Sequence, residues 1–310
     1  MRRALVAAVA AVAAATGTLA GCSAGGATDD RPHIVVTTNI LGDVVAGAVG
    51  DAARGTTLMR PDADPHSFEI SPREAAMMRE ADLVVSNGLG LEEGLQRHLD
   101  RAADAGVEMY VAGRQVAVLD YVAGDSAGAP DPHFWTDPAR MIDVVDGLEG
   151  AVREIDGIDE KVVMRAAAAY RTELGELDRE MTDSFASIPQ RRRSLVTNHH
   201  VFGYLADRFG FRVVGAVVPG GTTLAAPSAA DLRDLAEAIE EAGVPTIFAE
   251  SSQPDRLIQV LADEAGVDVG VTELFTESLT AKGRGADTYL TMMRANTARI
   301  TSGLSAEPTD

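Results

Sequence analysis

Short apolar runs alternate with amphipathic stretches along most of the chain, and this is the pattern of strands and helices in turn. Strand-like runs lie at 33–38, 56–59, 82–86 and 106–111, and again at 195–197, 213–218, 246–249 and 267–272. Helical patterns lie at 41–49, from Ser71 onward, and near 200–209, 228–242, 254–265 and 287–301. Such alternation predicts parallel sheets covered by helices.

A long helical stretch separates the two sets of strands. From Pro138 to about Ile188 the pattern is helical, and 159–187 contains no proline. Apolar residues recur there at three- and four-residue steps, at Val162, Val163, Ala166, Tyr170, Leu174, Leu177, Met181 and Phe185. A helix of about 28 residues is roughly 42 Å long, which is more than one small lobe needs. We therefore expect an α/β fold of two (β/α) lobes with parallel sheets, 32–158 and 189–310, joined by one long spine helix at 159–188.

The N-terminus has the pattern of an export signal. Arg2 and Arg3 precede an apolar stretch at 4–18, which is too short to span a bilayer as a mature helix. Leu19-Ala20-Gly21-Cys22 then looks like a bacterial lipoprotein signal, with cleavage before Cys22 and a lipid on its sulfur. We expect 1–21 to be a signal peptide and 22–31 a flexible tether. The alternative is an ordinary secretory signal that leaves a free thiol.

The composition of the chain limits which molecules it can be expected to bind. The chain has 27 basic and 47 acidic residues, a formal net charge of −20, which argues against nucleic acid and against electrostatic docking on anionic lipid. It has a single cysteine, so neither an internal disulfide nor a thiolate metal site is expected.

One tripeptide occurs twice. Asp64-Pro65-His66 and Asp131-Pro132-His133 repeat the same residues, in a chain with only six histidines. Proline restricts its own φ and the residue before it, so each imidazole leaves a stiff loop in a defined direction. His199 follows a predicted strand, and Asp287 is an isolated acid before the last helix. Three imidazoles and one carboxylate make a closed tetrahedral set for Zn²⁺.

Several sequence blocks together resemble one known family. They are 62–69 with 81–92, 131–138, 199–204 with 209–211, Pro227-Ser228 with 247–250, and 289–296. These blocks are similar to those of the zinc- and manganese-binding proteins that supply bacterial ABC importers, the cluster 9 solute-binding proteins. The resemblance implies two (β/α) lobes on one long helix, with the metal in the cleft between the lobes. It also implies His66, His133, His199 and Asp287 as ligands, the first two from the N-terminal lobe and the others from the C-terminal lobe.

The third ligand position separates the branches of the family. Manganese-binding members often carry Glu there and zinc-binding members His, so His199 favours one Zn²⁺ per chain, with Mn²⁺ as the alternative. Many members have Asp after the third ligand where this chain has His200, which leaves His200 open as a ligand or a neighbouring group. Glu250 is open as a ligand or as an acceptor for an imidazole N–H. Asp287 could also cap the last helix.

These features predict a metal carrier rather than an enzyme. The expected function is an extracytoplasmic lipoprotein, anchored to the cell membrane through lipid on Cys22, that captures Zn²⁺ and passes it to an ABC permease driven by a cytoplasmic ATPase. The chain has neither a GxxxxGK(S/T) phosphate loop nor an HExxH helix, and a fourth protein ligand would fill the position that a zinc hydrolase keeps for water. A hydrolase and a surface adhesin are the alternatives.

Two expectations concern metal loading and release. Many zinc-binding members of the family that this chain resembles carry a long loop rich in His and Asp before the second ligand. The corresponding stretch 121–130 is short and has no histidine, so the resemblance implies that such a loop is absent or lies on another protein, such as a metallochaperone. The segment 276–286, which contains Lys282-Gly283-Arg284-Gly285, is expected to move when metal leaves.

Overall fold

The computed structural model describes residues 29–122, 126–218, 223, 228–251 and 270–305. Residues 31–310 form one compact unit. Within the described ranges no helix has the length and apolar character needed to cross a bilayer. The predicted signal peptide, Cys22 and the helix expected at 254–265 lie outside the described residues.

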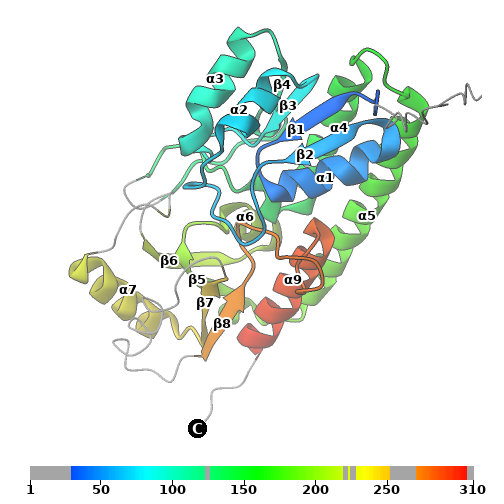
Figure 1. Ribbon diagram of the computed structural model, residues 1–310. Coiled ribbons are helices and arrows are strands. Elements are labelled where there is room, and N and C mark those ends of the chain that lie inside the picture. The colour runs from blue at the N-terminus through cyan, green and yellow to red at the C-terminus, as the bar shows by residue number, and fades with distance from the viewer. Residues whose placement is uncertain (1–28, 123–125, 219–222, 224–227, 252–269, 306–310) are drawn as a thin grey trace, which may run out of the picture. The chain divides into compact units, whose positions relative to one another are not determined.

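The first sheet is built from the first third of the chain (Figure 1). Its order is β2-β1-β3-β4 and all its pairs are parallel. The strands are β1 (His33–Val36), β2 (Arg54–Thr57), β3 (Leu83–Ser86) and β4 (Glu108–Val111), with α1 (Asn39–Val49), α2 (Pro72–Arg79) and α3 (Gln96–Asp104) between them. The central strands β1 and β3 are buried along their whole length, as apolar runs in a covered parallel sheet should be. Ser71 caps α2 in a capping box with Glu74.

The second sheet repeats this plan with the same strand order. It runs β6-β5-β7-β8, again with parallel pairs. The strands are β5 (Ser194–His199), β6 (Arg212–Val218), β7 (Thr246–Glu250) and β8 (Gly270–Leu274), and the helices are α6 (Gly203–Phe209), α7 (Ala229–Ala242) and α9 (Tyr289–Ser305). The predicted α/β fold with two parallel sheets is therefore confirmed.

The long helix is α5 (Glu160–Ala186), of 27 residues, and it follows α4 (Pro138–Arg153) after a short break. Asp159 begins α5, because its side chain accepts from the backbone N–H groups of Lys161 and Val162. The buried stripe of α5 consists of Val163, Ala167, Tyr170, Leu174, Leu177, Met181 and Phe185. Helix α5 packs against α1 and α4 and also against α9, so it contacts helices of both sheets (Figure 1).

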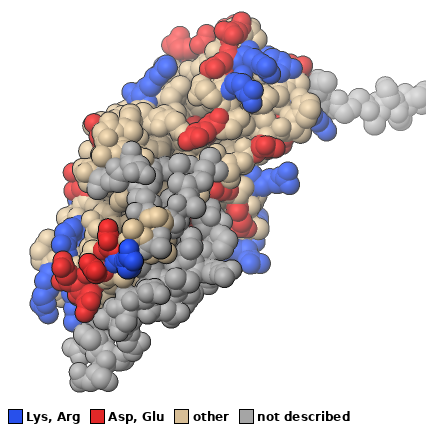
Figure 2. Space-filling model, turned by 90° about the vertical axis from the view of Figure 1, so that its left-hand side faces the viewer, with Lys and Arg blue, Asp and Glu red and all other residues tan. Residues whose placement is uncertain are grey.

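One continuous apolar core connects the two sheets. It contains Ile34 of β1, Leu177 of α5, and Phe248 of β7, together with residues of α9 such as Ile300. Two smaller apolar clusters lie apart from this core. One is under α2 and α3, and the other is under α7. On the face shown in Figure 2, acidic and basic side chains lie interspersed among uncharged residues. Most of the apolar burial is therefore shared between the sheets rather than confined to either one.

The strands of both sheets present their carboxyl ends to one region. Ser86 at the end of β3 leads into Asn87, β5 ends at His199, and β7 ends at Glu250. In open parallel sheets, ligands bind outside the carboxyl ends of the strands. The topology thus selects the loops that form the site.

The buried stripe of α5 makes a stability prediction. Leu174 is 0% exposed, so Leu174→Ala should leave a cavity and lower the free energy of unfolding by about 2–5 kcal/mol. Met164 on the same helix is 47% exposed, and Met164→Ala should change it by no more than about 0.5 kcal/mol. Urea unfolding of both variants in the presence of a chelator measures the difference. Equal stabilities would show that the α5 stripe does not support the core.

Candidate metal centre

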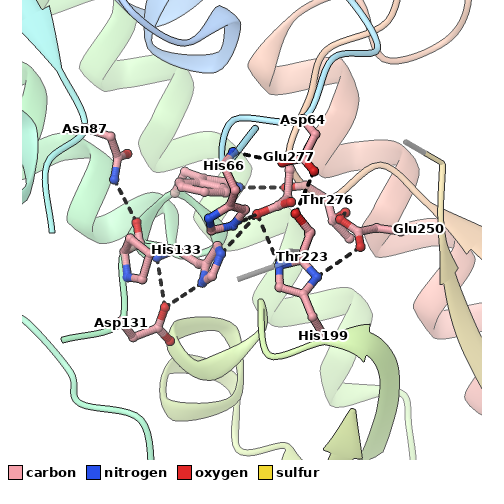
Figure 3. Close-up of polar contacts among 12 residues, drawn as sticks. Asp64, His66, Asn87, Asp131, His133, His199, Thr223, Glu250, Thr276 and Glu277 are labelled. Atoms are coloured by element: carbon pink, nitrogen blue, oxygen red, sulfur yellow. Dashed lines mark hydrogen bonds and ion pairs between the residues drawn. The ribbon is translucent and has the colours of Figure 1, made fainter. Parts of the chain in front are cut away.

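Four buried side chains converge where the two sheets meet (Figure 3). They are His66, His133, His199 and Glu277, none more than 2% exposed, and one ligand atom from each lies within 4.8 Å of all the others. The Oε1 atom of Glu277 lies 3.0 Å from Nε2 of His66, 3.1 Å from Nε2 of His133 and 3.2 Å from Nε2 of His199. Three imidazoles therefore face a single carboxylate oxygen.

The repeated Asp-Pro-His tripeptide is explained by its aspartate. Asp64 Oδ1 accepts the backbone N–H of His66 at 2.8 Å, and Asp131 Oδ1 accepts that of His133 at 2.9 Å. An aspartate that bonds the backbone two residues on makes a local turn, so the acid as well as the proline fixes the direction of each imidazole. The second carboxylate oxygen of Asp64 accepts from Thr223 Oγ1 at 2.6 Å.

His133 is held on its other ring nitrogen. Its Nδ1 lies 2.7 Å from Asp131 Oδ1 and 3.2 Å from the Tyr121 hydroxyl, which leaves Nε2 directed at Glu277. The tripeptide loop is also held from the first sheet, because Asn87 Nδ2 donates to the Pro132 carbonyl at 3.0 Å. Gly203 permits this packing, since a Cβ there would lie 2.5 Å from Asp131 Oδ2. A carboxylate behind an imidazole is the arrangement that orients histidine ligands in metal sites.

His199 has an equivalent support. Its Nδ1 lies 3.0 Å from Glu250 Oε2, and the other oxygen of Glu250 accepts from the Thr276 hydroxyl. Glu250 thus contacts His199 from the far side of the ring. His200 is not in the cluster: it is half-buried, with its ring centroid 6.4 Å from that of Tyr121. Burial and the neighbouring His199 lower the pKa of His200.

The structure does not bring Asp287 to the cluster, and Glu277 lies in the place expected for it. Asp287 is on the surface, where its Oδ2 accepts the backbone N–H of Gly283 at 2.8 Å, and this bond lowers its pKa. The alternative role of Asp287 as the cap of α9 is taken by Thr288, whose Oγ1 accepts the Thr291 N–H at 3.2 Å. One feature of the sequence could have indicated Glu277. It comes shortly after a strand, just as His199 and Glu250 are the last residues of their strands.

The cluster contains buried atoms without partners. Among the described residues, Nδ1 of His66 and Oε2 of Glu277 make no hydrogen bond, although both are fully buried. A buried polar atom left unpaired is costly, and a carboxylate more so. The donor set of imidazole nitrogens and carboxylate oxygens, turned inward and incompletely paired, fits a divalent cation.

The charges of the cluster are mutually dependent. Burial lowers the pKa of His133 and His199, but the carboxylates of Asp131, Glu250 and Glu277 outweigh it and raise both pKa values. Burial also raises the pKa of Glu277, yet the facing imidazoles hold it well below its ordinary value. The carboxylates therefore favour the protonated forms of His133 and His199, and these imidazoles favour the charged form of Glu277.

Two parallel sheets that enclose buried imidazoles and a carboxylate define a two-lobed metal-binding protein. Comparison with known protein families identifies the family. Residues 34–303 match the model of the family described as "Zinc-uptake complex component A periplasmic", and the chain belongs to this family. Members of this family are solute-binding proteins of ABC metal transporters rather than enzymes.

Relatives in the family are named for different metals. The chain is 27% identical over 290 residues to the manganese-binding lipoprotein MntA of Halalkalibacterium halodurans, covering 92% of this chain and 94% of that protein. It is 26% identical over 270 residues to the iron-binding protein YfeA of Yersinia pestis, covering 87% and 85%. The periplasmic zinc-binding protein TroA of Treponema pallidum has a similar structure, with a TM-score of 0.81 at 26% identity over 89% of this chain and 100% of that one. Family membership therefore defines a metal-binding protein but not its metal.

The pKa directions can be tested in the metal-free protein. We expect His133 and His199 to titrate above the ordinary histidine pKa and His200 below it. Glu250→Gln should lower the pKa of His199, because the variant removes the negative charge beside Nδ1. Imidazole nitrogen NMR across a pH series, in the presence of a chelator, reports both. A His199 pKa unchanged by Glu250→Gln would show that the carboxylate is not what raises it.

Proposed function

We propose that this protein captures Zn²⁺ outside the cytoplasm and delivers it to an ABC permease coupled to a cytoplasmic ATPase. The observation that supports this most is the buried group of His66, His133, His199 and Glu277, whose ligand atoms all face one another. The ligand set is thus the sequence-based one with Glu277 in place of Asp287. Glu250 and Asp131 would orient the imidazoles from behind rather than bind the ion.

The spacing of the four donors suits a small ion. Around a tetrahedral Zn²⁺ with bonds of about 2.0–2.1 Å, neighbouring donor atoms are about 3.3 Å apart. The three distances from Glu277 Oε1 to the imidazole nitrogens are 3.0, 3.1 and 3.2 Å. The three contacts to Glu277 are therefore already close to the spacing that a tetrahedral Zn²⁺ needs.

The choice of zinc follows from the ligand chemistry. Three imidazoles and one carboxylate form a nitrogen-rich set, which suits Zn²⁺, whereas Mn²⁺ prefers sites richer in oxygen. A relative named as a zinc-binding protein supports this choice. Relatives named as manganese-binding lipoproteins support the alternative, Mn²⁺, at the same site.

The attachment to the membrane rests on the N-terminal sequence. We assign 1–21 as the signal peptide, Cys22 as the lipidated residue and 22–31 as the tether, and relatives are named lipoproteins. Beyond the tether, 32–158 and 189–310 would be the two lobes, joined at 159–188, where α5 lies.

The identity of the fourth ligand gives a direct test. Glu277→Gln should weaken Zn²⁺ binding by at least about 10-fold, because the amide keeps the shape but loses the charge that the cation needs. Asp287→Asn should bind Zn²⁺ like the parent, since Asp287 is on the surface. Chelator competition gives both affinities, and the same titrations with Mn²⁺ establish the preferred metal. A loss of affinity in Asp287→Asn alone would overturn the ligand assignment, and tighter Mn²⁺ than Zn²⁺ binding would overturn the choice of metal.

Proton competition gives a second test. The metal-free imidazoles of His133 and His199 have raised pKa values, and only neutral imidazole binds a cation. The apparent affinity should therefore rise with pH up to those raised pKa values, and fall steeply as pH drops through and below them. Calorimetry in buffers of different ionisation enthalpy should also detect protons released on binding. A Zn²⁺ affinity that does not change between about pH 8 and pH 5 would contradict imidazole ligation.

A further inference from the structure

Glu277 reaches the cluster on a segment that is fastened mainly to the other sheet. It follows β8 of the second sheet, and the Thr276 hydroxyl bonds Glu250 of that sheet, but the bonds of the Thr276 and Leu279 carbonyls lead to residues of the first half of the chain. Trp135 Nε1 donates to the Thr276 carbonyl at 2.8 Å, and the Asp62 N–H donates to the Leu279 carbonyl at 3.0 Å. Residues 276–280, which we call the Glu277 strap, are all buried.

The side chain of Glu277 lies among the same residues. It lines a crevice that is too narrow to hold a water molecule. The other lining residues are Thr38, Ile40, Leu41, Pro65, Asn87, Leu91 and Trp135, all of which precede α4 in the sequence. The carboxylate ligand is therefore seated against the first sheet, although its own strand belongs to the second.

Asn39 holds the strap through both polar atoms of its side-chain amide. Its Oδ1 accepts the Leu279 N–H at 2.9 Å, and its Nδ2 donates to Ser278 Oγ at 2.8 Å and to the Arg60 carbonyl at 3.1 Å. It is the first residue of α1 and is 8% exposed. Only a side chain that both accepts and donates can serve Leu279 and Arg60 at once, and the asparagine amide does so.

We propose that Asn39 is a positioning residue for metal binding: it holds the strap so that Glu277 Oε1 stays within reach of the three imidazoles. Asn39 does not touch the ion and acts only through Glu277. This inference rests on the proposed function of the cluster. It also changes the expectation for 276–286, because the ligand-bearing part of that segment is locked and only 281–285 are exposed.

The test compares Asn39→Ala with a control that loses a buried hydrogen bond elsewhere. Thr246 lies at the start of β7, away from the site, and its hydroxyl donates to the Gly303 carbonyl at 2.8 Å. Asn39→Ala should weaken Zn²⁺ binding by at least about 10-fold and accelerate release to a chelator. Thr246→Val should leave both unchanged even if it lowers the melting temperature similarly. Equal affinities for the two variants would mean that Asn39 supports only the fold.

A double-mutant cycle separates positioning from a general loss of structure. If Asn39 acts through Glu277, Asn39→Ala should cause little further loss of affinity in a Glu277→Gln background. A full additional loss of about 10-fold there would overturn the proposal. Should Asn39→Ala not fold, Ser278→Ala removes one of the same contacts from the strap side, and it should weaken binding in the parent but not in Glu277→Gln.

These experiments also distinguish a failure of the proposed function. If the parent protein binds neither Zn²⁺ nor Mn²⁺, the metal site itself is wrong. If the parent binds and Glu277→Gln weakens binding while Asn39→Ala and Ser278→Ala match the parent, only the role of Asn39 is wrong.

Discussion

The contact between one carboxylate oxygen and three imidazole nitrogens is the constraint on which the rest of this structure depends. Glu277 Oε1 and the three Nε2 atoms are buried together, and a buried charge is tolerated only when it is well paired. Each imidazole must therefore arrive in one orientation. Asp131 and Glu250 provide this for His133 and His199 by accepting from the second ring nitrogen, and the Asp-Pro-His turns fix the backbone. The residues at the ends of the strands and in the loops that follow them therefore hold each imidazole with its Nε2 toward Glu277.

The fold could be predicted because its signal is local. Buried parallel strands have continuous apolar runs, and the stripe of α5 repeats at helical steps, so both are visible in the sequence. The edge strand β2 shows where prediction from the hydrophobic pattern fails. Its register with β1 begins at Arg54, before the strand-like run at 56–59, because backbone pairing holds an edge strand whose side chains are largely exposed. A hydrophobic pattern cannot report pairing that does not bury side chains.

The site could be predicted only in part, for a related reason. The histidines stand out because they are few and because two share a tripeptide. Glu277 is one of 47 acidic residues, and its role depends on contacts with residues as distant in sequence as His66. Asp287 is isolated in the sequence and close to a helix start, yet its carboxylate is occupied by the Gly283 N–H of its own loop. A local motif can indicate a stiff ligand, whereas a ligand chosen by tertiary packing requires the fold.

The seating of Glu277 has a consequence for how a bound ion could leave. The loops of His66 and His133 belong to the first half of the chain, and Asn39 of α1 holds the Glu277 strap, whereas His199 and Glu250 end strands of the second sheet. The strap has one bond to that sheet, from the Thr276 hydroxyl to Glu250. A small separation of the sheets would therefore break the bond between Thr276 and Glu250 and move His199 away from the other three donors. The apolar core shared along α5 and α9 opposes a wide separation, because that movement would expose buried apolar area. A small shift that removes one imidazole costs far less than opening the core, and the loss of one of four ligands is enough to weaken the hold on a cation.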